Sequence, residues 1–277
     1  MAGTHAARPR CVAGLLAALV LAACATPAAR IDARAAASGF AREVIAGERY
    51  RHLVYFRAGA PHRPLHVYIE HDGSPWVGEV RVAGDPTPRR PLMLELMAHD
   101  AAPALYLGRP CYFGIERDPP CAPPLWTARR YAPEVIDSMA AALARFLAQH
   151  PHSRLVFLGH SGGGTLAVLL AERFKQTAAV VTIGANLDVA RWTRLHGYTA
   201  LTGSLDPRTR VPLPRRVLQR HYVGSRDTTV PPALARGYAE RHPPAEVVEI
   251  AGYDHVCCWR ERWPAILADL AERLAGP

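Results

Sequence analysis

The chain has 277 residues, 49% of them hydrophobic, with a formal net charge of +9. This length is near the upper end for a single domain and is enough to bury a substantial core. The positive charge is almost entirely arginine, because Lys175 is the only lysine. The arginines are scattered and no nucleic-acid-binding motif accompanies them, so we expect no nucleic-acid partner.

The N-terminus carries the features of an export signal. Basic residues precede an apolar run over residues 12–23, which is too short to span a bilayer comfortably. Its end, Leu21-Ala22-Ala23-Cys24, resembles the lipobox of bacterial lipoproteins. The resemblance implies removal of residues 1–23, acylation of Cys24 and, in a Gram-negative host, attachment to the outer membrane facing the periplasm. The alternative is an ordinary signal peptide cut after residue 23 or 25.

Residues 24–39 are predicted to form a linker, and residues 40–277 form one domain without internal repeats. Strands are predicted over 40–45, 50–57, 65–69, 104–107, 154–158, 178–183, 217–223 and 245–250. Helices are predicted over 92–99, 133–149, 165–174, 231–241 and 259–274. This alternation favours a mostly parallel sheet with helices on both faces. Residues 77–91 are expected to be irregular surface, and a small mixed insertion over 185–216 follows the sixth strand.

A long irregular segment over 108–131 has a length typical of functional or disordered loops. Its aromatic residues indicate an ordered loop, and Cys111 and Cys121 bracket its proline-rich part. An exported protein can keep a disulfide there, which would stabilise the fold by roughly 2–3 kcal/mol. Cys257 and Cys258 are adjacent in sequence, and their state stays open between free, buried and bonded to each other.

The segment Gly159-His160-Ser161-Gly162-Gly163 lies between a predicted strand and a predicted helix. A serine flanked by glycines in this context is typical of the nucleophile elbow. The turn strains the serine backbone, so its close neighbours must lack a β-carbon. The next N–H, that of Gly162, then lies at a helix N-terminus, where it can bind developing negative charge. The alternative is a glycine-rich turn that exposes an unreactive serine.

A catalytic serine needs a base, and that base needs an orienting acid. His255 is the predicted base, because it follows the last strand and precedes the last helix. Of the other histidines, His221 lies inside a strand, His242 ends a helix, and His160 is expected to pack beside the serine.

Asp227 is the predicted acid, because it follows the strand over 217–223 within a few residues. Two other carboxylates compete with it. Asp206 has no strand ahead of it, and Asp254 adjoins His255 in sequence and cannot easily reach behind the imidazole ring.

The elbow, Asp227, His255 and the turn over 70–74 together resemble the α/β-hydrolase superfamily from about residue 40 onward. The resemblance implies an oxyanion hole formed by the N–H of Gly162 and by a second N–H from Asp72 or Gly73. Glu70 and His71 stand where the family usually has histidine and glycine, so the second donor stays open between those two residues.

The same resemblance implies a serine hydrolase that cleaves a carboxylic ester of a small-molecule or lipid acyl substrate, without a cofactor. A metal is not expected either, because the pair His150 and His152 has no third ligand nearby. Alternatives on the same triad are a peptidase, a thioesterase or an acyltransferase. A surface-anchored binding lipoprotein without catalysis is a further alternative.

Overall fold

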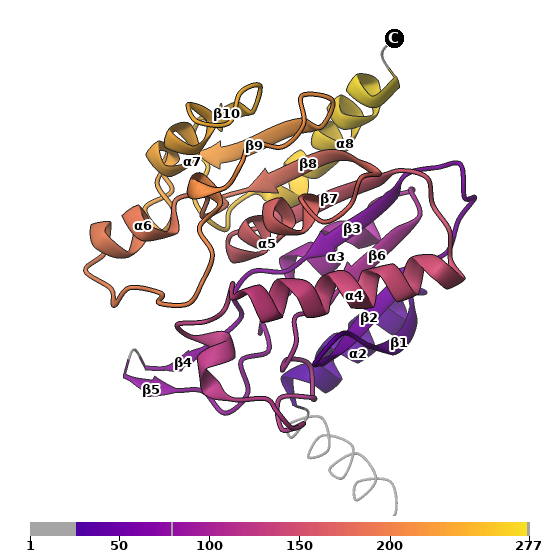
Figure 1. The fold of residues 1–277 in the computed structure, drawn as a ribbon. Coiled ribbons are helices and arrows are strands. Elements are labelled where there is room, and N and C mark those ends of the chain that lie inside the picture. The colour runs from indigo at the N-terminus through magenta and orange to yellow at the C-terminus, as the bar shows by residue number, and fades with distance from the viewer. Residues whose placement is uncertain (1–25, 79, 276–277) are drawn as a thin grey trace, which may run out of the picture.

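The computed structural model describes residues 26–78 and 80–275, so the predicted signal peptide and Cys24 lie outside the described residues. The centre of the molecule is an eight-stranded sheet with the order β1-β2-β6-β3-β7-β8-β9-β10 (Figure 1). Its strands are β1 (Ala41–Ala46), β2 (Arg51–Arg57), β3 (Leu65–Ile69), β6 (Ala104–Leu107), β7 (Leu155–His160), β8 (Thr177–Ile183), β9 (Leu218–Gly224) and β10 (Glu246–Ile250). The strands predicted over 40–45 and 50–57 are present as β1 and β2, which pair antiparallel.

Strand β2 is antiparallel to both of its neighbours, and the pairs from β6 through β10 are parallel. The inner strands are buried on both faces, which explains their continuous apolar runs such as Leu155–Leu158. Because the parallel strands end at one edge of the sheet, the loops that follow β3, β6, β7, β8, β9 and β10 meet there.

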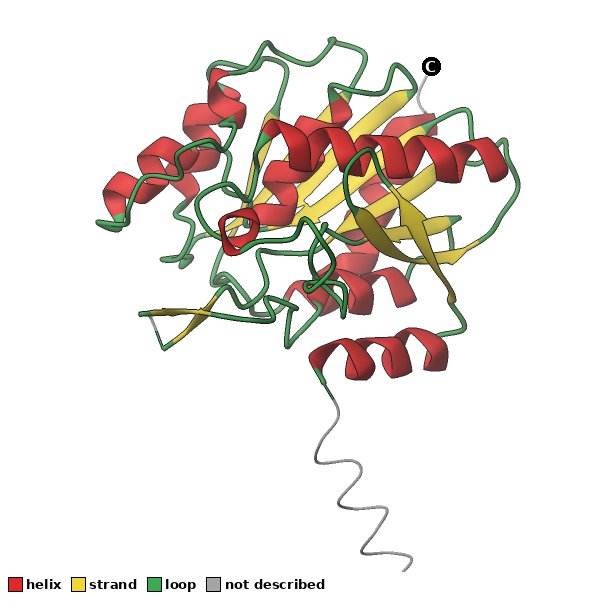
Figure 2. Cartoon of the chain, turned by 60° about the horizontal axis from the view of Figure 1, so that its bottom comes forward, coloured by secondary structure: helices red, strands yellow, loops and turns green. Residues whose placement is uncertain are grey.

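Helices cover both faces of the sheet, as predicted (Figure 2). One face of the sheet is covered by three helices that connect successive parallel strands through right-handed crossovers. They are α4 (Pro133–Gln149), α5 (Gly162–Ala171) and α7 (Pro232–Ala239). The helices α3 (Leu92–Ala98) and α8 (Trp259–Ala275) pack against each other on the opposite face. Both layers bury large side chains, including Phe157 of the sheet and Trp263 of α8.

The predicted linker over 24–39 is wrong for most of its length, because helix α2 (Pro27–Ala37) occupies it. The Thr26 hydroxyl caps the helix by accepting the N–H of Ala29 at 3.2 Å. Ile31 and Ala35 are buried against the first strands. The folded body therefore begins well before residue 40.

Three segments that were expected to be irregular or mixed contain short elements. The two-residue strands β4 (Trp76–Val77) and β5 (Arg81–Val82) form a small hairpin. The insertion after β8 contains helix α6 (Val189–Leu195) and the 3-10 turn η2 (Pro207–Thr209), and the loop over 108–131 contains η1 (Pro123–Trp126). None of the helices in the described ranges has the length and apolarity that crossing a bilayer requires.

Candidate active site

Ser161 occupies a strained turn between β7 and α5. Its backbone has φ 53° and ψ −124°, a conformation that residues with a β-carbon rarely adopt. A β-carbon on Gly159 would lie 2.3 Å from the carbonyl oxygen of Gly163, and one on Gly163 would lie 2.2 Å from the carbonyl oxygen of Ile69. These close approaches explain why the turn is rich in glycine.

The structure joins the predicted base and acid. Nδ1 of His255 donates to Oδ2 of Asp227 at 2.7 Å. The second carboxylate oxygen of Asp227 accepts the N–H of Val230 at 2.8 Å, and this side chain is fully buried. A buried carboxylate held from both sides can fix the tautomer and orientation of the imidazole.

The serine turn and this pair meet at the end of β8. The N–H of Ser161 donates to the carbonyl of Ile183 at 3.0 Å. A β-carbon on the next residue, Gly184, would lie 3.2 Å from Oδ2 of Asp227 and 3.2 Å from Nδ1 of His255. Three loops that are far apart in sequence thus converge around one glycine with positive φ.

The competing histidines have other partners. Nε2 of His160 donates to the carbonyl of His255 at 3.0 Å, and the two rings lie 4.9 Å apart. Burial, together with the imidazole of His255, holds the pKa of His160 well below its usual value. His221 pairs with the Thr182 hydroxyl at 2.9 Å inside the sheet, where burial lowers its pKa to about 3. His242 stacks on Tyr238 at 4.1 Å.

The two carboxylates that competed with Asp227 for the role of the acid accept hydrogen bonds from backbone amides instead. Asp254 accepts the N–H groups of Val256 and Cys257 at 2.8 and 2.7 Å. Asp206 accepts the N–H of Ala190 at 2.9 Å, across the insertion. Neither carboxylate contacts the imidazole of His255 among the hydrogen bonds of the described residues.

The turn after β3 lies beside the elbow. Its hydrogen bonds distinguish between the two predicted second oxyanion donors, Asp72 and Gly73. The N–H of Gly73 donates to Nδ1 of His71 at 3.0 Å, so this amide is engaged within its own turn, which favours Asp72 over Gly73 as the second donor. The His71 ring is fixed in turn by donating from Nε2 to the carbonyl of Arg90 at 3.1 Å. The N–H of Asp72 makes no hydrogen bond within the described ranges, which leaves it as the candidate from this turn.

Glu70 holds the turn after β3 in place. It is one of the two residues, with His71, that stand where the α/β-hydrolase superfamily usually has histidine and glycine. Its buried carboxylate accepts the N–H of His71 at 3.2 Å and that of Met93, in the first turn of α3, at 2.9 Å. Burial raises the pKa of Glu70 above its usual value.

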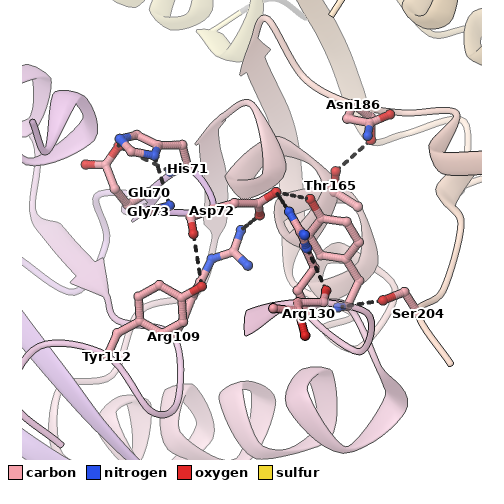
Figure 3. A network of polar contacts seen from close by, with 12 residues as sticks. Glu70, His71, Asp72, Gly73, Arg109, Tyr112, Arg130, Thr165, Asn186 and Ser204 are labelled. Carbon is pink, nitrogen blue, oxygen red and sulfur yellow. Dashed lines mark hydrogen bonds and ion pairs between the residues drawn. The ribbon is translucent and has the colours of Figure 1, made fainter. Parts of the chain in front are cut away.

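The carboxylate of Asp72 is the centre of a charged network (Figure 3). It accepts from Nη2 of Arg109 at 2.6 Å, from Nη1 of Arg130 at 2.9 Å and from the Tyr131 hydroxyl at 2.7 Å. The Tyr112 hydroxyl donates to the backbone carbonyl of Asp72 at 3.0 Å. Hydrogen bonds and ion pairs therefore join five residues of two loops beside the elbow.

The network touches the elbow directly. A β-carbon on Gly162 would lie 1.9 Å from Oδ1 of Asp72, so the carboxylate rests against the glycine whose N–H is the first predicted oxyanion donor. Arg109 and Arg130 are only 2% and 7% exposed. Burial disfavours the charged carboxylate, but these two guanidinium groups outweigh it and hold the pKa of Asp72 well below its usual range.

The sequence did not single out Arg109, Arg130 or Tyr131. The signal available was the length of the loop over 108–131, which supplies all three. That loop is closed by the predicted cysteine pair, since Cys111 and Cys121 have their sulfurs 2.10 Å apart. Cys257 and Cys258, left open by the sequence, are bonded to each other. No group of three or more metal-binding side chains gathers in the described part of the chain.

Comparisons with known proteins agree with this architecture. Residues 111–206 match the family described as the alpha/beta hydrolase fold. An esterase of Pyrococcus furiosus is similar in structure, with a TM-score of 0.61 and 12% identity over 87% of this chain and 93% of that chain. A membrane phospholipase A described as a bacterial virulence factor has a TM-score of 0.57 and 15% identity over 97% of this chain and 100% of the other.

An acylaminoacyl peptidase of Pyrococcus horikoshii has a TM-score of 0.60 and 12% identity, over 84% of this chain and 41% of that one. A comparison with curated protein sequences gave no match. At these identities the likeness defines the fold and leaves the reaction open. The chain has the α/β-hydrolase fold.

Proposed function

We propose that the protein is a serine hydrolase that cleaves carboxylic esters with Ser161, His255 and Asp227. The observation that carries the proposal is the 2.7 Å hydrogen bond between Asp227 and His255, at the sheet edge where Ser161 is held with positive φ. An esterase and a phospholipase are among the structural neighbours and suggest an ester, but a peptidase of similar likeness is among them too, so the leaving group is tested directly.

In the proposed reaction, Oγ of Ser161 attacks the acyl carbon while Nε2 of His255 takes its proton. Asp227 stabilises the imidazolium that forms. His255 then donates this proton to the departing alcohol as the C–O bond breaks, which leaves an acyl-enzyme. A water molecule, deprotonated by the same imidazole, attacks the acyl-enzyme and releases the acid.

The N–H groups of Gly162 and Asp72 are the proposed donors to the oxyanion, which usually receives the largest electrostatic stabilisation in such reactions. A carboxylate beside Gly162 would by itself oppose negative charge there. Asp72 is paired with two buried guanidinium groups, so the cluster as a whole is positive. We infer that Arg109 and Arg130 both fix the position of the Asp72 N–H and reverse the sign of the local field.

The proposal is tested by incubating the protein with a fluorophosphonate and measuring its intact mass. We expect one adduct on the wild type and none on Ser161→Ala. Ser153→Ala is the matched control, because Ser153 is exposed just before β7, at the opposite edge of the sheet. Absence of an adduct on the wild type would refute an activated serine and favour a binding protein.

Turnover is tested with a butyrate ester, the matching thioester and the matching amide. Preference for the ester, lost in Ser161→Ala, is the expected result. Higher kcat/KM for the amide or the thioester would assign the protein to a peptidase or a thioesterase instead, and transfer of the acyl group to an added alcohol would assign an acyltransferase.

We also propose that the protein is exported and anchored through an acylated Cys24. The lipobox-like sequence supports this, and so does the bonded pair Cys111 and Cys121, because such bonds persist in oxidising compartments. In a bacterial host, the full chain should fractionate with membranes and carry an N-terminal mass increase of several acyl chains. Cys24→Ala should lose both properties, and a wild-type chain found only in the soluble fraction would refute the anchor.

A further inference from the structure

A cleft of about 650 Å³ opens beside the proposed catalytic base. Its inner end is lined by His71 and His160, whose rings lie 5.6 Å apart. The ring of His160 lies 4.9 Å from that of His255. The cleft therefore lies next to the imidazole of His255, with the ring of His160 between them.

One part of the cleft lining is apolar. The segment that follows His255 contributes Val256, the bonded pair Cys257 and Cys258, and Trp259, while Leu92 at the start of α3 lies in the same lining. Val256 is 61% exposed, which is high for an aliphatic side chain. This part can receive carbon chain but offers little to hold a charge.

The rest of the cleft is basic. Arg89, Arg90 and Arg260 lie in its lining. Arg260 is already paired with Glu95, which also pairs with Arg34. By contrast, Arg89 and Arg90 are exposed and form no ion pair with any residue in the described ranges.

Glu261 is the other carboxylate in the lining, so the cleft keeps a net positive charge. Arg89 and Arg90 are adjacent in sequence, lie in the same lining and have no carboxylate partner in the described ranges. A phosphate group suits such a pair, because its several oxygens can accept hydrogen bonds from two guanidinium groups.

The position of the cleft decides which part of an ester it receives. A leaving alcohol must lie within hydrogen-bond reach of the imidazole that protonates it. The cleft lies beside His255, so we infer that it receives the alcohol part of an ester whose leaving oxygen reaches that imidazole.

We propose that the substrate is an acyl ester whose alcohol part carries a phosphate group, bound by Arg89 and Arg90. This inference rests on the proposed ester hydrolysis. Water adds to the acyl carbon, the bond to the alcohol oxygen breaks, and the fatty acid and the phosphate-bearing alcohol are released.

The test compares 1-butyrylglycerol 3-phosphate with 1-butyrylglycerol, two soluble esters that differ in the phosphate alone. Titration of the released butyric acid gives kcat/KM for each. We expect the wild type to prefer the phosphate ester by about tenfold or more at low salt, with the preference falling as salt is added. Arg89→Gln/Arg90→Gln should reduce that preference to about twofold or less.

The matched control is Arg215→Gln/Arg241→Gln. Both arginines are exposed, and they precede β9 and β10, at the opposite edge of the sheet from the cleft. This variant loses the same two charges and should keep the preference. If both double variants lose it equally, or if the wild type shows none, the cleft does not recognise phosphate and the inference is wrong.

A binding measurement separates this inference from the proposed reaction. Titration calorimetry on Ser161→Ala with the phosphate ester should give binding that Arg89→Gln/Arg90→Gln weakens about tenfold. If the protein binds the phosphate ester in this way but the wild type does not hydrolyse it, the proposed ester hydrolysis is wrong and the proposed recognition of phosphate stands. Inorganic phosphate binding as tightly as the ester would show a site for the free anion and overturn the substrate class.

Discussion

Replacing Asp72 by alanine should destabilise the fold strongly. Asp72 forms ion pairs with Arg109 and Arg130 at 2.6 and 2.9 Å, and both arginines are nearly inaccessible to solvent. Removing one partner of a buried charge pair costs about 3–5 kcal/mol, because it leaves the other charge uncompensated. For a chain of this size that loss lowers Tm by about 6–20 °C, which thermal unfolding followed by circular dichroism can measure.

Asp72→Asn should fall between the wild type and the alanine variant, since the amide keeps an oxygen for the Arg130 and Tyr131 donors but loses the charge. The pH dependence of the difference is a sharper test. The pKa of Asp72 is depressed in the folded state, so its stabilisation is present above the carboxyl pKa of the unfolded chain, about 4, and fades as the pH falls below it. The Tm gap between the wild type and Asp72→Asn should therefore narrow as the pH falls from 6 through 3.

Two results would refute this reasoning. A Tm of Asp72→Ala within about 2 °C of the wild type would mean that the network carries no buried charge coupling. A gap between the wild type and Asp72→Asn that stays constant down to pH 3 would mean that the Asp72 carboxylate is not held ionised by its partners. Arg241→Gln, which removes one exposed charge, serves as the control for general charge effects.

Three further predictions concern the same site. Asp227→Asn should lower kcat of ester hydrolysis by about 10³–10⁴-fold with little change in Tm, because the amide cannot hold the imidazole in its working tautomer, and a loss below tenfold would contradict that role. Gly162→Ala should abolish fluorophosphonate labelling, because its β-carbon would collide with the Asp72 carboxylate, and full labelling of this variant would contradict the geometry. The double variant Cys111→Ser/Cys121→Ser should lose about 2–3 kcal/mol in urea unfolding, and an unchanged midpoint would show that the bond does not stabilise the fold.

The sequence predicted those parts of the molecule that short-range pattern determines. Apolar runs alternating with amphipathic segments gave the sheet and its main helices, and the glycines around Ser161 marked the elbow. Asp227 and His255 could be chosen because each closely follows a strand, and the ends of parallel strands share one edge. The expected fold is present in full, and the two chosen residues are joined in it.

The partners of Asp72 could not be predicted in the same way. Arg109 and Arg130 lie in a loop without periodicity, and their positions follow from long-range packing. Many other arginines in the chain look equivalent in the sequence. The choice between Asp72 and Gly73 likewise depended on the direction of one N–H, which the ring of His71 decides.

Helix α2 was missed although its signals were present. Ala28, Ile31 and Ala35 are spaced as one helical face, and Thr26 with Pro27 forms a recognisable start. The face is weak because two of its three buried residues are alanines. The small apolar area of these alanines can hold the helix in place because the helix packs against the edge of the sheet.

The same helix sets how far the enzyme could move from a membrane. Under the proposed acylation of Cys24, three residue steps separate the anchor from Pro27, a reach of at most about 10 Å. Pro27 and Arg30 border a hollow that they share with Arg89, at the basic end of the proposed substrate cleft. So short a tether would keep that end near the headgroup layer. Acyl esters that diffuse laterally within the same bilayer would then pass within reach of the cleft, in addition to soluble esters that arrive from solution.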